Sequence, residues 1–311
     1  MSEKLTKNER RAQAREQARK MQEERRRRER LKKGLTIGGI IVAAVAVVAI
    51  VAVVIVSSIR PAGPGPENMA SNGIVIGQDF VAERTAATPA DGEPTPTAQR
   101  DDVIQIEIYQ DYMCPVCGAF DDANRATLEQ LITTGAATVE VHPISILDSQ
   151  SLGSKYSTRS ASAAACVAEF APDQFWDFNS AMFENQPAER TSGLTNDEIV
   201  GIAQGAGIDT AGGLADCITE GRFMSWVENA TVRAGTQELP GTDGVVADRT
   251  PTVVVNGQRY PGAANDAAGF QAFVTAVAGQ TDGSSEEPAE TEAPAETEAP
   301  AESETPAPSE G

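Results

Sequence analysis

Two cysteines separated by two residues, Cys114 and Cys117, constrain this 311-residue sequence more than any other feature. A hydrophobic, β-branched run over residues 103–109 leads into them, and a helical pattern from residue 115 to about 132 follows. Cysteines three positions apart at a helix start share a face of the first turn, close enough to form a small disulfide ring. Pro115 fits the first helical position, where no N–H donor is needed. The stretch predicts a redox-active pair between a strand and a helix.

The predicted position gives the two cysteines different roles. Unpaired N–H groups and the helix dipole favour an anion at a helix N-terminus, so they lower the pKa of the Cys114 thiol. A lower pKa makes Cys114 an attacking thiolate and a good leaving group. We therefore expect Cys114 to be the nucleophile, Cys117 the resolving thiol, and Pro115 and Val116 the active-site dipeptide between them.

The net charge of −20 is unevenly distributed. Residues 1–33 hold 14 Lys/Arg against 6 Asp/Glu, residues 57–279 hold 11 against 29, and residues 280–311 hold none against 10. The acidic main body would repel phosphates, which excludes a nucleic-acid-binding role for it.

The sequence before residue 57 predicts a membrane anchor. Residues 35–56 are 22 uncharged, mostly aliphatic residues, enough to cross a bilayer as a helix. The basic arm before them, residues 1–34, is expected in the cytoplasm by the positive-inside rule, which places the body outside, where disulfides persist. A cleaved signal peptide is less favoured because its apolar region is usually shorter. The basic arm could instead bind nucleic acid, which is the less favoured role for it.

Two segments have compositions that oppose regular structure. Residues 57–71 are rich in Pro and Gly and are expected to form a stalk. Residues 280–311 form an acidic Pro/Ala/Glu/Thr tail with a six-residue repeat and no aromatic residue, so they cannot bury a core and are expected to be disordered.

The pattern of the body predicts strand, helix, strand, a block of helices, then strand, strand, helix. Strand patterns over 103–109 and 138–143 flank the cysteine-bearing helix, which makes a βαβ unit with the pair at the carboxyl end of its first strand. Helical patterns fill a block over about 150–235, and a strand over 252–255 precedes an Asn-Gly turn and a closing helix. An α/β fold with an inserted helical domain is expected.

Cys166 and Cys217 remain if Cys114 pairs with Cys117. Both fall in predicted helices, where they form either a structural disulfide or two separate buried thiols. Their wide spacing opposes a four-cysteine zinc site, which would need a second Cys-x-x-Cys. His142, the only histidine, is interpreted as structural because the sequence suggests no acid–base partner nearby.

Two segments resemble DsbA-like thiol–disulfide oxidoreductases of the thioredoxin superfamily. Residues 109–120 are Tyr-Gln-Asp-Tyr-Met-Cys-Pro-Val-Cys-Gly-Ala-Phe, like the active-site segment of that family. Residues 249–257 are Arg-Thr-Pro-Thr-Val-Val-Val-Asn-Gly, like its Thr-Pro-Thr, strand and Asn-Gly segment. The resemblance covers about residues 72–279, and a membrane-anchored form with an extra Cys pair in the helical block is similar to actinobacterial members.

The resemblance implies a thioredoxin-like fold and roles for further residues. Pro251 would be a cis-proline facing the Cys pair, and Thr250 would offer its backbone to an extended substrate chain. Two positions differ from the family pattern. The dipeptide is Pro-Val where the best-known oxidising members have Pro-His, and Ile108 stands where many relatives have a buried acid. Glu107 is adjacent and is expected on the other face of the strand.

We expect an extracytoplasmic, membrane-anchored enzyme that introduces disulfides into reduced secreted or envelope proteins and needs no metal or organic cofactor. The resemblance also implies a quinone-linked membrane partner that reoxidises the pair. A disulfide reductase or isomerase is the second candidate enzyme, since cysteine spacing does not set the direction. Two non-enzyme functions are also possible from the sequence: an envelope interaction module with two structural disulfides, and a metal-binding module.

Overall fold

The computed structural model describes residues 63–90, 92–100 and 102–281. The predicted arm (1–34), membrane span (35–56), first part of the stalk and almost all of the acidic tail lie outside these residues. Within the described residues, no helix is both long and apolar enough to cross a membrane.

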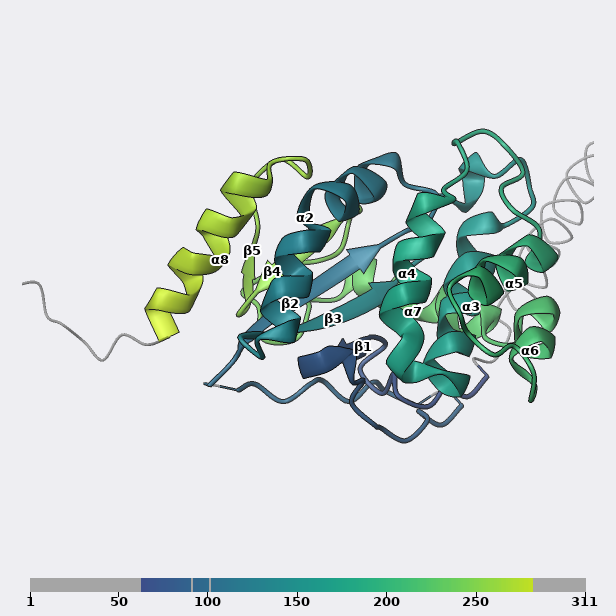
Figure 1. Cartoon of the computed structure of the whole chain (residues 1–311), viewed down its shortest axis with the longest axis horizontal. Helices are drawn as coiled ribbons and strands as arrows, with labels where there is room; N and C mark the ends of the chain where they lie inside the picture. Colours follow the sequence, from purple (N-terminus) through teal and green to yellow (C-terminus); the bar gives the residue numbers. More distant parts are fainter. Residues whose placement is uncertain (1–62, 91, 101, 282–311) are drawn as a thin grey trace, which may run out of the picture. The chain divides into compact units, whose positions relative to one another are not determined.

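A five-stranded mixed sheet forms the centre of the domain, in the order β1-β3-β2-β4-β5 (Figure 1). The parallel strands β2 (Ile104–Gln110) and β3 (Ala137–Pro143) are joined by helix α2 (Pro115–Thr133), which confirms the predicted βαβ unit. The remaining pairs are antiparallel: β1 (Ile74–Ile76) on β3, β4 (Thr252–Val255) on β2, and β5 (Gln258–Arg259) on β4.

One face of the sheet carries the main apolar core. Ile106 and Ile108 of β2 are buried there because alternate strand residues face the same side. Helices α2 and α8 (Ala267–Thr281) pack on each other through Phe120 and Phe270, whose rings meet edge to face with centroids 5.3 Å apart. This packing fixes the start of α2, and with it the Cys pair, against the sheet.

The opposite face buries a polar cluster that the sequence did not suggest. The parallel register pairs Glu107 with Glu140 and Tyr109 with His142, so four polar side chains share one face. The His142 ring stacks on Tyr109 at 4.1 Å, and its Nε2 lies 3.3 Å from a carboxylate oxygen of Glu140. Burial raises the pKa of Glu107 to about 7. His142 therefore has an acidic neighbour, contrary to the interpretation of the sequence, but it remains buried in a packed layer.

The block of helices lies mainly between β3 and β4 in the chain. Thr195 and Glu198 begin α5 with both halves of a capping box. Helix α3 is rich in Ala and Ser and is buried along most of its length, so its neighbours approach it closely. The block contains α3 (Tyr156–Phe170), α4 (Phe175–Glu184), α5 (Asn196–Gly205), α6 (Leu214–Glu220) and α7 (Met224–Thr236) (Figure 1).

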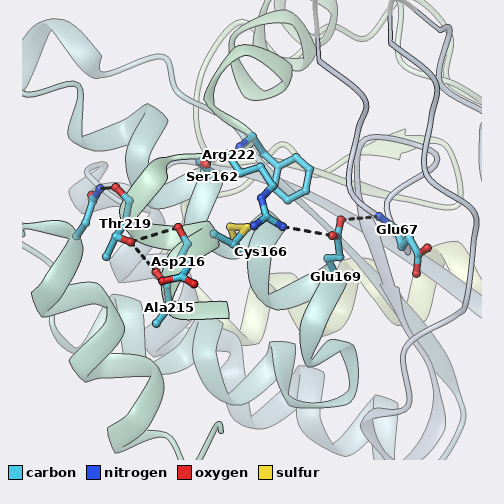
Figure 2. Close-up of a disulfide and its surroundings, with 11 residues drawn as sticks. Glu67, Ser162, Cys166, Glu169, Ala215, Asp216, Thr219 and Arg222 are labelled. Carbon is cyan, nitrogen blue, oxygen red and sulfur yellow. Dashed lines mark hydrogen bonds and ion pairs between the residues drawn. A yellow bond between two sulfur atoms is a disulfide. The ribbon is translucent and has the colours of Figure 1, made fainter. Parts of the chain in front are cut away.

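A disulfide joins Cys166 of α3 to Cys217 of α6, with their Cα atoms 5.9 Å apart (Figure 2). This is one of the two outcomes that cysteine counting left open. Beside it, the carboxylate of Glu169 lies 3.8 Å from the guanidinium of Arg222 and accepts a hydrogen bond from the backbone N–H of Glu67. The disulfide therefore holds together two helices of the block that are far apart in the chain.

The folded domain begins earlier than the sequence indicated. Met69, placed in the predicted stalk, is fully buried in the core. The amide of Asn68 donates to the carbonyl of Ala168, 2.9 Å away, and the N–H of Gly65 donates to the carbonyl of Thr88, also at 2.9 Å. Pro and Gly exclude a helix or strand here, but an irregular chain still packs when its polar groups find partners. The end of the predicted stalk is thus part of the domain.

Removal of the Cys166–Cys217 disulfide should lower stability substantially. The two cysteines are separated by 51 positions. Cross-linking a loop of that length contributes about 4 kcal/mol in the chain-entropy model. We expect the Cys166→Ala/Cys217→Ala variant to unfold at a clearly lower urea midpoint than the wild type. The difference should vanish in excess dithiothreitol, which cleaves the wild-type disulfide; equal midpoints without reductant would contradict the prediction.

Candidate active site

The Cys pair lies where β2 ends and α2 begins. Cys114 is the N-cap of α2, with extended φ/ψ angles of −78° and 113°, and Pro115 occupies the first helical position. The N–H of Cys117 donates to the carbonyl of Cys114 at 3.0 Å, which closes the first turn. Both cysteines are free thiols, and Cys114 keeps 6% of its surface exposed against 2% for Cys117. Cys114 is thus the outer member of the pair, and the exposed Val116 lies between them.

A loop from the far end of the chain faces the pair. β4 runs antiparallel to β2 with Thr252 opposite Tyr109, so the residues just before β4 come to the carboxyl end of β2. The peptide bond between Thr250 and Pro251 is cis, the form that the family resemblance implies. The Cys114 thiol donates to the Thr250 carbonyl at 3.4 Å. The structure therefore brings together the predicted pair and the predicted Thr-Pro segment, which are 136 residues apart.

The surroundings separate the acidities of the two thiols. The pKa of Cys114 is lowered to about 6, mainly by a hydrogen bond from the Cys117 thiol, with help from the Thr250 side chain and the backbone N–H groups of Cys117 and Val116. Burial raises the pKa of Cys117 well above its ordinary value, and the neighbouring Cys114 adds to that rise. The arrangement supports an outer thiolate and an inner protonated thiol near neutral pH.

Asp111 fixes the loop in front of the pair. Its carboxylate is fully buried and accepts hydrogen bonds from the N–H of Met113 at 2.8 Å and the N–H of Leu147 at 2.9 Å. Burial raises its pKa to about 6, and the charge of Cys114 acts in the same direction. The sequence placed this carboxylate near the pair, but its bond to Leu147, beyond β3, is a tertiary contact that no local pattern shows.

Gln186 holds the same loop from the helical block. Its side-chain N–H group donates to the carbonyls of Tyr112 at 3.0 Å and Cys114 at 2.9 Å. The side chain lies over Gly118, where an added Cβ would sit 2.5 Å from Gln186 Oε1. Sequence reasoning missed Gln186 because its only local feature is its position just after α4. Gly118, in the active-site segment, is the one hint that something packs closely there.

The carboxylates of Glu107 and Asp121, on either side of the pair in the sequence, are hydrogen-bonded to other side chains. Glu107 lies on the opposite face of the sheet, as expected, and accepts a hydrogen bond from the Tyr109 hydroxyl at 3.2 Å. Ile108 is buried in the apolar core. Asp121 accepts from Arg125 Nε at 3.0 Å, although burial still raises its pKa to about 6. Asp111 is thus the carboxylate that shares the buried environment of the pair.

Comparisons with known proteins agree with this geometry. A family model described as thioredoxin matches residues 102–276. The chain is similar to the reduced form of a disulfide bond oxidoreductase (DsbG) from Mycobacterium tuberculosis, with 26% identity, a TM-score of 0.51, and 67% of this chain and 88% of that chain covered. It is similar to oxidised Mtb DsbA with 27% identity, a TM-score of 0.51, and coverage of 67% and 93%. Among curated proteins, none matches the sequence.

The acidity of Cys114 can be determined from its alkylation. Because its pKa is lowered to about 6, the rate of reaction of the reduced protein with iodoacetamide should rise as the pH increases through about 6 and level off above it. Cys117→Ala removes the largest cause of the lowered pKa, so its curve should shift to higher pH. A midpoint near the ordinary thiol value in the wild type would contradict the assignment.

The contribution of Gln186 can be tested against its neighbour. Gln186→Ala removes the hydrogen bond to the Tyr112 carbonyl and one of those to the Cys114 carbonyl, which also accepts from the N–H of Cys117. This loss should cost about 1–3 kcal/mol in the free energy of unfolding. Asn185→Ala is the matched control, because the exposed Asn185 amide donates only to Ala181 of its own helix among the described residues. Equal urea midpoints for the two variants would show that Gln186 does not hold the loop.

Proposed function

The chain belongs to the thioredoxin family and resembles its DsbA-like members, and from this premise we propose that it oxidises protein thiols outside the cytoplasm. The observation that carries the proposal is the pairing of an outer thiol of lowered pKa, Cys114, with a buried inner thiol of raised pKa, Cys117. Such a pair exchanges disulfides with other chains through its outer sulfur.

In the first step, a substrate thiolate attacks Cys114 Sγ of the Cys114–Cys117 disulfide. The S–S bond breaks, and its electron pair leaves on the Cys117 sulfur. That sulfur takes up a proton, as its raised pKa favours. The product is a mixed disulfide between the substrate and Cys114. The buried position of Cys117 directs the attack to Cys114.

In the second step, another thiolate of the substrate attacks the substrate sulfur of the mixed disulfide. The Cys114 sulfur leaves as a thiolate, which its lowered pKa makes a good leaving group. Two substrate thiols have then become a disulfide, and the two electrons reside on the reduced Cys pair. The cycle closes when another thiol–disulfide reaction removes them.

The stability of the reduced pair supports oxidation of the substrate as the direction of the reaction. Hydrogen bonds to Cys114 stabilise its thiolate, which exists only after the pair has been reduced. They therefore favour transfer of electrons from substrate to enzyme, which is oxidation of the substrate. Cys114 and Cys117 are free thiols, whereas Cys166 and Cys217 form a disulfide. This difference opposes the hypothesis in which both cysteine pairs are structural disulfides.

The location and the partner are part of the proposal. The uncharged stretch over 35–56, preceded by a basic arm, supports a single-pass anchor with the domain outside the cytoplasm. Substrates would be reduced secreted or envelope proteins. A quinone-linked membrane partner would accept the electrons of the reduced pair, and the anchor would hold both at the same surface.

Substitutions of the two cysteines should fail in different ways. With a reduced secreted protein as substrate, Cys114→Ala should lose all oxidation, because no sulfur is left for the first attack. Cys117→Ser should also lose oxidation, because it cannot form the Cys114–Cys117 disulfide that the substrate attacks. Given a substrate that already contains a disulfide, its Cys114 thiolate should attack that bond and accumulate a mixed disulfide, visible on non-reducing gels, because the thiol that would resolve it is missing. Undiminished activity of Cys114→Ala would refute the proposal.

The direction has its own measurement, the reduction potential of the pair. A value of about −120 mV is expected for an oxidase, and one of about −270 mV would identify a reductase.

A further inference from the structure

A groove beside the Cys pair differs in charge from the rest of the domain. It has a volume of about 630 Å³ and is lined by the start of α2, the Thr250–Pro251 loop and the residues that follow β5. Of the described residues that line it, none is acidic, and two are arginines, Arg249 and Arg259. By contrast, the larger cleft over α2, α4 and α5 is lined by Glu129, Asp177, Glu184 and Glu198. An acid-free groove is unusual in a body with 29 acidic residues against 11 basic ones.

The two arginines of the groove differ in burial and in their interactions. Arg259 is partly buried; it lies 3.2 Å from Asp248 and donates to the Thr252 hydroxyl at 3.1 Å. Arg249 is exposed and makes no ion pair within the part of the chain that the structure describes. Its backbone is fixed, because the Thr252 hydroxyl donates to the Arg249 carbonyl at 2.8 Å. Arg249 is therefore a positive charge at the rim of the groove that has a fixed backbone and no ion-pair partner among the described residues.

Most other cations of the domain are already paired. Among the described residues, Arg84, Arg100, Arg125, Lys155 and Arg222 each have a carboxylate partner. An exposed arginine without such a partner can attract a carboxylate from another chain. Arg249 directly precedes the Thr250–Pro251 loop, which contacts Cys114. A chain that reacts with Cys114 is therefore the one whose carboxylate Arg249 can attract.

The rest of the groove suits an extended peptide. Its other lining side chains include Val116, which is 51% exposed, and the aromatic rings of Phe120 and Tyr260. Because Thr250 contacts Cys114 and Arg249 directly precedes Thr250, a peptide whose cysteine sulfur reaches Cys114 along this groove would come next to Arg249. Side chains on either side of that cysteine would meet the apolar wall or the guanidinium.

We propose that Arg249 makes the enzyme select substrate segments in which the reacting cysteine is flanked by Asp or Glu. The selection rests on the proposed function, because it concerns the chain that attacks Cys114. Arg249 acts by attracting the flanking carboxylate, and it takes no part in the sulfur exchange. An exposed ion pair of this kind changes an equilibrium by about two- to five-fold.

The test uses oxidised wild-type protein and short dithiol peptides that differ only in the residues beside the first cysteine, which are Glu, Gln or Lys. The rate of reduction of the Cys114–Cys117 disulfide is measured by rapid acid quench and alkylation. A flanking charge also changes the reactivity of the peptide thiol itself. That effect cancels when the Glu/Gln rate ratio of one protein variant is divided by that of another.

The Glu/Gln ratio of the wild type should exceed that of Arg249→Gln by about two- to five-fold. Arg249→Glu should reverse the order and favour Lys. Arg222→Gln is the control of equal charge change, because Arg222 lies beside the Cys166–Cys217 disulfide (Figure 2) and does not line the groove. Its ratio should equal that of the wild type. Raising the ionic strength from about 0.01 M to about 1 M shortens the screening length from about 30 Å to about 3 Å and should abolish the preference.

The outcomes separate the two ideas. One outcome is that the peptides reduce the disulfide and the Glu/Gln rate ratio is the same in the wild type and in Arg249→Gln. The proposal that Arg249 selects substrates is then wrong, and the proposed function stands. An equal loss of preference in Arg222→Gln would likewise overturn it, by showing an effect of net charge alone. Each peptide is also allowed to reduce a simple dialkyl disulfide. If no peptide reduces the Cys114–Cys117 disulfide faster than it reduces that reference compound, the proposed function itself fails.

Discussion

The hydrogen bond from the Cys117 thiol to the Cys114 sulfur is the interaction on which the chemistry of this domain depends. It is the largest cause of the lowered pKa of Cys114, and it exists because the first turn of α2 places both sulfurs on one face. The same contact, together with burial, keeps Cys117 protonated. In the proposed function, this one short-range contact distinguishes the sulfur that attacks and leaves from the sulfur that resolves.

The remaining structure keeps that turn in place from several directions. Phe120 and Phe270 press α2 against α8, Asp111 ties the preceding loop to Leu147, and Gln186 ties it to the helical block. The inserted helices are therefore more than an appendage, since one of their side chains bonds directly to the backbone of Cys114. The Cys166–Cys217 disulfide stabilises that block without taking part in the exchange, which allows one chain to contain a permanent and a reactive cysteine pair.

Local patterns predicted most of the framework for physical reasons that act within a few residues. The β-branched run before Cys114 and the proline after it each specify backbone geometry through neighbours in the chain, and the predicted strand and helix are observed. The predicted stalk includes Met69, which the structure buries in the core. A composition that opposes regular structure does not prevent the chain from packing. The interpretation of His142 was incomplete for a similar reason: its neighbours Glu140 and Tyr109 meet it only through strand register and burial.

By itself, the sequence determined where the candidate redox pair lies, since the spacing of Cys114 and Cys117 at a helix start is a local property of the chain. It also determined that the body is acidic and that an uncharged stretch precedes it. Only the tertiary structure decided what surrounds the Cys pair: the Thr250 carbonyl, the Gln186 amide, and a groove whose rim holds Arg249. These groups come from distant segments, and only the folding of the sheet and the helical block brings them to the end of one strand.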